Sequence, residues 1–370
     1  MVPTGTVSST YKSLLHKMTQ TTQTCLWNDS AARAELAYSI EHGGVGATCN
    51  PVIVVDVLKA EWNDWQGRIC ELIAALPNAT EDEIGWKLAE DISIGAARLL
   101  EPAFEIHKGR NGRLSLQTDP RLYRDAKRML EQAAHFSGLA KNIIVKIAAT
   151  NAGIAAMEEA THRGVSINAT VCFTLPQCLA VAEAIERGLR KREHEGKDIA
   201  TMGPVCTIMV GRLDDWLKVV QEKRPADVDP SIFEWAGIAV FKKTYEIFRK
   251  RGYRTRLLAA AFRNDMHWSE LVGGDIVISP PHKWQVRFNA SDIDVVSRIQ
   301  NPVDPAIVKA LSDNFIDFRK AYSEDGLSGK EFDTFAPTRR TLRQFMSACH
   351  ELNSQIRDVM IPNPDNEKLT

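Results

Sequence analysis

Eight short apolar segments, separated for the most part by segments with helical periodicity, constrain the fold of this chain more than any other feature. Alternation of strand and helix is typical of a parallel sheet covered by helices. Eight such units favour a closed (β/α)8 barrel, a TIM barrel, and the alternative is an open doubly wound sheet. The predicted strands are Thr24–Trp27, Val45–Thr48, Leu114–Thr118, Ile143–Ala148, Ser166–Thr170, Val205–Val210, Arg256–Ala261 and Asp275–Ser279.

Helix signals support the same α/β class. Thr80 and Glu83 form a capping box, and the apolar stripe of the helix that they begin runs to Leu99, ahead of Pro102. A second long stripe, Leu342–Ile356, predicts a helix close to the C-terminus.

The length of the chain exceeds what a barrel requires. A barrel takes about 250 residues, so about 120 of the 370 residues are additional. We expect a single domain over residues 1–370, with the barrel at 20–290 and a helical extension at 291–370 that packs on it. Further extra helices are expected between the second and third strands.

Charge and cysteine content narrow the classes of partner. Lys plus Arg is 46 and Asp plus Glu is 47, which gives no electrostatic case for binding nucleic acid or an anionic membrane. No apolar run approaches the roughly 18 residues that cross a bilayer, and residues 1–23 lack the apolar core of a signal peptide. Seven cysteines without a CxxC pair favour free thiols in a reducing compartment, so we expect a cytoplasmic protein.

Metal-ligand spacing is absent among the nine histidines, and no phosphate-cradling glycine motif is present. We therefore expect neither a metal nor a cofactor. His267 follows the predicted seventh strand closely, and a structural role is favoured over a place in the site.

Lys146 is the most informative residue, because it lies in the middle of the apolar segment Ile143–Ala148. Both faces of a parallel strand are normally buried, so a charge there is costly. Strand alternation places Lys146 on the face of Ile144 and Ala148. If that face points into the barrel, burial lowers the pKa of the lysine, and its neutral amine can form a Schiff base. The alternative is a lysine whose ammonium escapes at the strand end.

Other polar residues end the predicted strands, where a barrel builds its active site. Arg212 and Arg263 suit a phosphate, and surface ion pairs are the alternative. Asn50 can bind a sugar hydroxyl or simply end the second strand. Asp29 can act as an acid/base or cap the following helix. The hydroxyl of Thr170 can hold a water or make a local bond.

The context of Lys146 resembles the transaldolase family. Related segments run in the family's order over about residues 24–281, and the ordered set is more specific than any one of them. They are Thr48-Cys49-Asn50-Pro51, Gly112-Arg113-Leu114-Ser115, Val145-Lys146-Ile147-Ala148-Ala149-Thr150 with Gly153-Ile154, Ile167-Asn168-Ala169-Thr170, Val210-Gly211-Arg212, Phe262-Arg263-Asn264 and Ile278-Ser279-Pro280. The stripe that begins at Leu342 resembles the helix that closes over the family's barrel mouth.

The resemblance implies a role for each matched residue. Lys146 would be the Schiff-base nucleophile on the fourth strand, and Thr170 would hold the catalytic water. Substrate contacts would come from Asn50, Thr207, Arg212 and Arg263, the two arginines binding the phosphate.

Two positions depart from the family pattern or leave it ambiguous, and a third distinguishes the branches of the family. The family's first-strand aspartate is its acid/base: the Trp-x-Asp form selects Asp29, whereas counting back from Asn50 selects Asn28, which cannot accept a proton. Gln117 replaces the third-strand glutamate, and glutamine is also found in the fructose-6-phosphate aldolase branch. Phe173 stands where that branch has a tyrosine, as in transaldolases.

The expected function is transfer of a dihydroxyacetone unit from a ketose phosphate to an aldose phosphate, without a metal. Through the family, the pentose phosphate pathway is implied. The alternatives are an aldolase-type lyase, a sugar-phosphate-binding protein without catalysis, and imine chemistry on another carbonyl substrate. The expected partner is a phosphorylated sugar, and a homodimer is possible through any of several helical faces.

Overall fold

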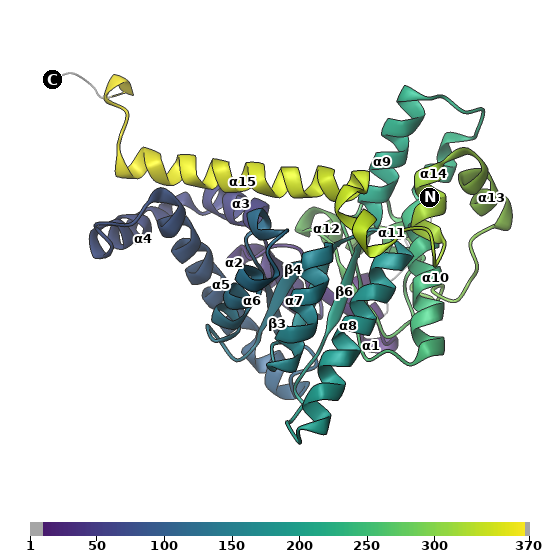
Figure 1. The fold of residues 1–370 in the computed structure, drawn as a ribbon, viewed down its shortest axis with the longest axis horizontal. Helices are drawn as coiled ribbons and strands as arrows, with labels where there is room; N and C mark the ends of the chain where they lie inside the picture. The colour runs from purple at the N-terminus through teal and green to yellow at the C-terminus, as the bar shows by residue number, and fades with distance from the viewer. Residues whose placement is uncertain (1–9, 367–370) are drawn as a thin grey trace.

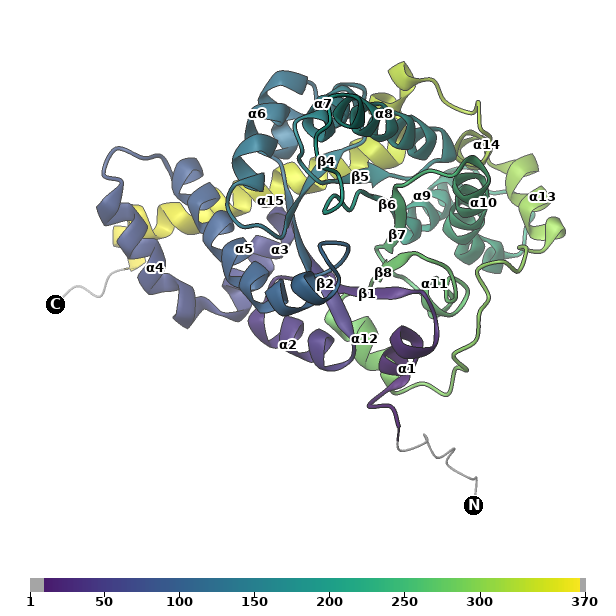
Figure 2. The ribbon, with the colours of Figure 1, turned by 90° about the horizontal axis from the view of Figure 1, so that it is seen from below.

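The computed structural model describes residues 10–366, and in it eight parallel strands close into a barrel in sequence order (Figure 2). Each strand pairs with the next, and β1 also pairs with β8, which closes the ring. The predicted barrel is therefore confirmed and the open sheet is excluded. The strands are β1 (Cys25–Asn28), β2 (Gly44–Cys49), β3 (Arg113–Gln117), β4 (Ile143–Ala148), β5 (Ile167–Cys172), β6 (Val205–Met209), β7 (Arg256–Ala260) and β8 (Val277–Ser279).

The predicted strands all occur, with ends that differ by at most two residues, and β4 has the predicted bounds. The largest differences are at β5, which continues two residues beyond Thr170, and at β8, which begins at Val277 instead of residue 275. The end of β5 is irregular: Val171 has a positive φ of 55°, and the pairing of β5 with β6 shifts register there. A β-branched residue in this conformation is strained, and no sequence pattern indicated it.

The helices occupy the connections between strands and the C-terminal part of the chain (Figure 1). They are α1 (Leu14–Thr21), α2 (Arg33–Glu41), α3 (Pro51–Ala60), α4 (Trp62–Ala75), α5 (Glu81–Ile106), α6 (Ala126–Ser137), α7 (Asn151–His162), α8 (Leu175–His194), α9 (Val210–Lys223), α10 (Ala236–Arg251), α11 (Met266–Ser269), α12 (His282–Asn289), α13 (Pro305–Asn314), α14 (Ile316–Tyr322) and α15 (Ala336–Met360), with short 3-10 turns at Pro120–Leu122, Pro230–Trp235, Gly329–Thr334 and Pro364–Asn366. No helix that the structure describes is both long and apolar enough to cross a membrane.

The extra helices lie where the sequence predicted them. Helices α3, α4 and α5 separate β2 from β3, and α13–α15 follow the barrel. Helix α15 runs along one end of the barrel and packs against α3 and α5 on one side and α9 on the other (Figure 1). Its buried side chains include Leu342, Phe345 and Leu352, so the predicted apolar stripe faces the barrel.

Helix α5 corrects one detail of the prediction. The capping box of Thr80 and Glu83 is formed. However, the helix continues through Pro102 to Ile106, and Leu99 is 45% exposed instead of packing in the stripe. A proline near a helix end removes one backbone hydrogen bond, and here the chain accepts that loss in the last turns.

The apolar residues form two separate cores. The larger lies between the sheet and the surrounding helices. The smaller lies inside the barrel and consists of six buried side chains from five strands: Trp27, Ile144, Val205, Leu258, Ala260 and Val277. This inner core fills part of the barrel, and the polar side chains described next lie farther along the same inward faces.

Candidate active site

Lys146 lies inside the barrel, as predicted from strand alternation. Ile144, two residues earlier on β4, belongs to the inner core, whereas Val145 and Ile147 pack in the outer core. Lys146 is only 2% exposed, and its side-chain amine makes no hydrogen bond or ion pair with any residue of the range 10–366. Burial lowers the pKa of this amine, and the nearby carboxylate of Asp29 partly opposes that effect.

The neighbours of Lys146 carry polar atoms that lack partners. Gln117 is its register partner on β3, and Thr170 faces Ala148 from β5. Gln117 Oε1, Thr170 Oγ1 and Ser279 Oγ are all buried and make no hydrogen bond within the described chain. Buried polar atoms are almost always paired, so three unpaired oxygens at the ends of three strands indicate a space for water or for a polar ligand.

The side chains of Asn28 and Asp29 have different environments. Asn28 is fully buried, donates to the Ser30 carbonyl oxygen at 2.8 Å and accepts from Gln285 Nε2 of α12 at 2.7 Å. Asp29 Oδ1 accepts from the inward-facing Thr48 hydroxyl at 2.7 Å. Asp29 therefore shares the inside of the barrel with Lys146, whose pKa it raises, while Asn28 is held under α12.

Asp29 does not cap the helix that follows it. Helix α2 begins at Arg33, and its N-cap residue makes no side-chain capping bond. The local bond in this turn is made instead by Ser30 Oγ, which accepts from the Ala32 N–H at 3.1 Å. The Asp29 carboxylate is thus free of the structural role that its position in the sequence also suggested.

A hydrogen-bonded chain crosses the barrel interior at the level of Lys146. Asn168 is the register partner of Lys146 on β5. Its amide nitrogen donates to Ser115 Oγ at 2.9 Å, and its carbonyl oxygen accepts from Thr207 Oγ1 at 2.7 Å. Thr207, predicted as a substrate contact, therefore has a fixed orientation from a residue that the sequence prediction did not select.

Asn50 ends the second strand and caps the helix that follows it. Its Oδ1 accepts from the N–H groups of Val52 and Ile53 at 2.9 and 3.1 Å, which caps α3. Its Nδ2 makes no hydrogen bond within residues 10–366, and the side chain lines a small cavity together with Gln117 and with Cys349 of α15. The cap fixes the amide so that its NH2 group remains available to a ligand.

Arg212 lies in the first turn of α9, beneath α15. Its Nη1 donates to Gln344 Oε1 at 2.5 Å, its Nε is buried without a partner, and no described carboxylate forms an ion pair with it. Burial first, and then the nearby charge of Arg263, lower the pKa of Arg212 to about 10. The α9 N-terminus itself has no side-chain cap. A guanidinium beside uncapped helix N–H groups forms a favourable anion site.

Arg263 lies at the same end of the barrel but is more exposed. It forms an ion pair with Asp215 at 2.9 Å, so the ion-pair alternative holds for Arg263 and not for Arg212. The Arg263 N–H donates to Nδ1 of the buried His267 at 3.0 Å, and His267 Nε2 lies 2.9 Å from Asp214 Oδ2. The structural role expected for His267 is thereby observed, and its specific task is to hold the backbone of Arg263.

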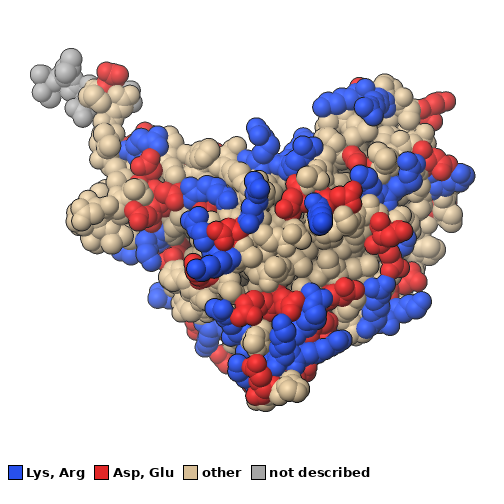
Figure 3. Space-filling model, viewed as in Figure 1, with Lys and Arg blue, Asp and Glu red and all other residues tan. Residues whose placement is uncertain are grey.

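Positive charge also comes from α15. Arg340 is close enough to Arg212 to lower the pKa of Arg212 further. Figure 3 shows Lys and Arg side chains along the upper edge of the molecule, in the notch between its two arms, where α15 lies in Figure 1. Sequence analysis missed Arg340, because only the tertiary position of α15 brings it to the site.

Phe173 differs from the other predicted site residues. Its ring is fully buried in the outer core, and its N–H donates to Gln177 Oε1 at 3.1 Å. It follows the strained Val171 by two residues and so marks the end of β5.

Asn168, Ser115 and Ser279 were quoted in the family segments but were not selected as site residues. Strand alternation contains the signal for all three. Each lies an even number of residues from an inward-facing residue of its own strand, namely Thr170, Gln117 and Val277.

Comparison with known proteins assigns the family. The sequence model of "Transaldolase/Fructose-6-phosphate aldolase" matches residues 26–334. The chain is 33% identical to a transaldolase of Thermobifida fusca over 197 residues, 51% of this chain and 53% of that protein. It is 29% identical to transaldolase 1 of Streptomyces avermitilis over 246 residues, 64% of each chain. These matches cover less than two thirds of the relatives' length. Because the family model spans well over half of the chain, the chain belongs to the transaldolase/fructose-6-phosphate aldolase family.

Proposed function

We propose that this protein is a transferase that moves a dihydroxyacetone unit from a ketose phosphate to an aldose phosphate through a Schiff base on Lys146. The observation that carries the proposal is a lysine inside the barrel, 2% exposed and without an anionic partner within the described chain. An amine in such a place is held ready as a neutral nucleophile. The names of the relatives, all transaldolases, support the same chemistry.

The reaction follows from the groups around Lys146. Its amine adds to the C2 carbonyl of the ketose, and loss of water gives the protonated imine. Asp29 accepts the proton of the C4 hydroxyl as the C3–C4 bond breaks, and the aldose phosphate leaves. The electron pair of that bond remains on the lysine-bound three-carbon unit as an enamine. Addition of the enamine carbon to the aldehyde of an acceptor, with return of the proton from Asp29, and hydrolysis of the imine release the new ketose.

Two unpaired polar atoms beside Lys146 would bind the water molecule that is released when the imine forms and consumed when it is hydrolysed. Thr170 Oγ1 and Gln117 Oε1 are buried without partners and flank Lys146 on β5 and β3. A hydroxyl and an amide can orient a water molecule by hydrogen bonds, although the amide cannot exchange a proton with it. The proton transfers would therefore fall to Asp29.

The phosphate would bind at the mouth of the barrel. Arg212 contributes a guanidinium without a carboxylate partner, and the uncapped N-terminus of α9 contributes backbone N–H groups. Arg263 and Arg340 add charge from β7's end and from α15. A dianion is attracted to such an arrangement. Asn50, with its free NH2 group, would bind a hydroxyl of the sugar nearer to Lys146.

Transfer competes with release of free dihydroxyacetone, which is the aldolase outcome. Helix α15 covers the mouth and limits water entry, which favours transfer. Gln117 favours the second outcome, because it is the residue of the aldolase branch that the sequence resembles at this position. With Phe173 in the transaldolase form, we place transfer first. The two outcomes separate when fructose 6-phosphate is supplied with and without an aldose phosphate: a transferase forms products only with the acceptor.

Borohydride trapping tests the imine. Reduction in the presence of fructose 6-phosphate should add one reduced three- or six-carbon unit to the peptide that contains Lys146. The Lys146→Met variant should remain unlabelled, and a cooperative thermal transition at or above the wild-type Tm should show that it is folded. Absence of a modified Lys146 peptide with several ketose phosphates would refute the Schiff base. Activity should persist in excess chelator, and its loss would indicate a metal-dependent reaction instead.

A further inference from the structure

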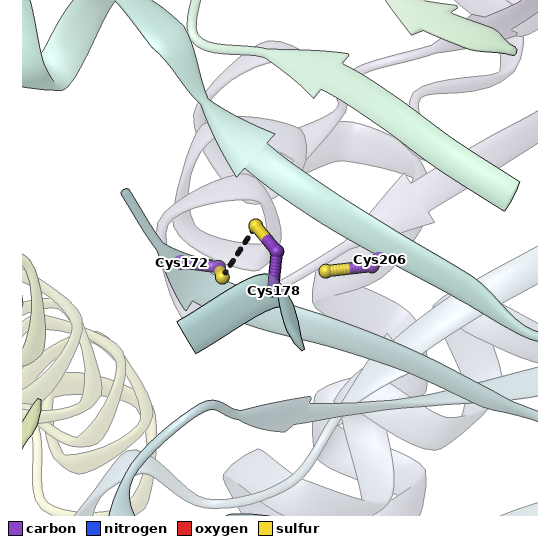
Figure 4. A group of neighbouring side chains, drawn as sticks. All are labelled: Cys172, Cys178 and Cys206. Atoms are coloured by element: carbon purple, nitrogen blue, oxygen red, sulfur yellow. Dashed lines mark hydrogen bonds between the residues drawn. The ribbon is translucent and has the colours of Figure 1, made fainter. Parts of the chain in front are cut away.

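Three of the seven cysteines meet outside the barrel, far apart in sequence but adjacent in space. Cys172 ends β5, Cys178 lies in the first turn of α8, and Cys206 lies on β6 (Figure 4). Their sulfur atoms all lie within 4.8 Å of one another, and the sulfurs of Cys172 and Cys178 are 3.4 Å apart. All three side chains are fully buried. The cluster fills part of the layer between the sheet and α8.

The irregular end of β5 places one of these thiols. On a regular strand, Cys172 would face the barrel interior with Asn168 and Thr170, because side chains alternate. The left-handed conformation of Val171 interrupts that alternation, and Cys172 packs instead in the outer core with Cys178 and Cys206. A β-branched residue at φ 55° is strained, so the chain gathers the third sulfur against a local energetic penalty.

The size of the triangle suits a central atom bonded to three sulfurs. At the usual length of about 2.3 Å for a metal–thiolate bond, tetrahedral or trigonal angles separate the sulfurs by about 3.8–4.0 Å. That separation lies between the shortest observed distance of 3.4 Å and the outer limit of 4.8 Å. The more acute angles of a pyramidal centre bring the sulfurs closer still. Sulfur shifts of up to about 1 Å would close the site.

Ligand number and charge decide which element fits. Among residues 10–366, no histidine, carboxylate or fourth cysteine joins the group, and burial excludes water as a fourth ligand. Structural zinc requires four ligands, and with three thiolates Zn(II) leaves a charge of −1 and Cu(I) a charge of −2. Such a charge is costly in an apolar layer. A trivalent centre with three thiolates is neutral and needs no fourth ligand.

We propose that Cys172, Cys178 and Cys206 form a three-sulfur binding site for a trivalent thiophilic element, with arsenic(III) as its ligand. The reaction is balanced and involves no oxidant. Uncharged arsenous acid, As(OH)3, meets three thiols; three S–H and three As–O bonds break, three As–S bonds form, and three water molecules leave.

Competing uses of the same thiols fit less well. A disulfide joins only two of the three sulfurs and needs an oxidant, so it leaves the third thiol of the cluster unused. Simple packing is the other possibility, since free cysteine behaves as a small apolar residue. Both possibilities predict that removal of any one of the three thiols leaves arsenite binding unchanged.

The experiment adds sodium arsenite to the reduced full chain in excess monothiol buffer and counts bound arsenic by native mass spectrometry. One arsenic should be retained, because three linked sulfurs outcompete free monothiols. Replacing Cys178 or Cys206 by alanine should weaken binding at least about tenfold through loss of the third linked ligand. The matched control, Cys70→Ser, removes an exposed thiol and should leave affinity unchanged.

X-ray absorption at the arsenic edge of the wild-type adduct gives a test that does not depend on how the variants fold. Three sulfur neighbours and no oxygen neighbour support the site. The proposal is overturned if the wild-type chain retains no arsenic, if the adduct has fewer than three sulfur neighbours, or if the alanine variants bind as the parent does. Preferential retention of Zn(II) over arsenic would overturn it as well, since it would mean that the charge argument fails.

Discussion

Replacement of Lys146 by methionine should stabilise the fold while it abolishes turnover. The lysine amine is buried without a partner in the described chain, and methionine fills a similar volume with no polar group. An unpaired buried polar group costs about 1–3 kcal/mol in proteins, so removing it should return about that amount. For 370 residues, an unfolding entropy of about 0.8 kcal/mol/K converts this gain into a rise in Tm of about 1–4 °C.

The pH dependence of this gain has a definite sign. Because burial lowers the pKa of Lys146, the unfolded chain binds a proton at this amine more readily than the folded chain. The stability of the wild-type protein relative to the variant therefore falls as the pH decreases from the ordinary lysine pKa toward the folded value, and it levels off below that value. Calorimetric melting of both proteins at a series of pH values below the ordinary lysine pKa measures the difference.

Lys242 provides the matched control for the same substitution. It is also buried, but its ammonium contacts Glu270 at 2.7 Å and two backbone carbonyl oxygens at 3.0 Å. Lys242→Met leaves the Glu270 carboxylate without its partner, so it should lower the free energy of unfolding by roughly 2–4 kcal/mol. This loss is somewhat smaller than that for a fully buried ion pair, because Glu270 is partly exposed. A lower Tm for Lys146→Met, or equal shifts for both variants, would refute the view that Lys146 is an unsatisfied amine.

Three further changes test one neighbour of the amine and two residues that pack beside Arg263. Gln117→Glu places a carboxylate beside Lys146, which should raise the pKa of the lysine and move the pH profile of kcat/KM to higher pH; an unmoved profile contradicts this placement. His267→Asn removes the acceptor of the Arg263 N–H, so it should weaken binding of a phosphorylated substrate by about 1 kcal/mol and raise its KM about fivefold. The kcat, and the KM for a non-phosphorylated analogue, should stay unchanged. Gly211→Ala drives a Cβ to 2.2 Å from a carbonyl oxygen, so it should lower Tm and phosphate affinity together, and a normal Tm would contradict the close approach.

The barrel and the place of Lys146 followed from periodicity, because both depend on local patterns. Strand alternation put Lys146 on the face of Ile144, and the observed inner core contains Ile144. It was harder to predict which residue at the end of β1 faces the inside of the barrel. Asn28 and Asp29 are adjacent, and the decision depended on Gln285, which lies 257 positions away and binds Asn28.

Other features depended on tertiary contacts that no local pattern contains. Arg340 reaches Arg212 only because α15 crosses the mouth of the barrel. The three clustered cysteines show no metal-binding spacing in sequence, and one of them changes face at a backbone conformation, that of Val171, which residue type disfavours. Strained positions of this kind override the propensities on which sequence analysis relies.

The interior of the barrel separates the requirement for stability from the requirement for chemistry. The inner core seals one part of the barrel with apolar side chains, including Ile144, which lies two residues before the lysine on the same face of β4. Beyond it, the inward positions change to Lys146, Gln117 and Thr170, whose polar atoms lack protein partners. Such atoms destabilise the folded chain until a substrate and its water pair with them. At this level of the barrel, a polar ligand is needed to complete the hydrogen bonds of these side chains. The proposed substrate, a hydroxylated ketose, supplies both the carbonyl that the amine attacks and the hydroxyls that these atoms bind.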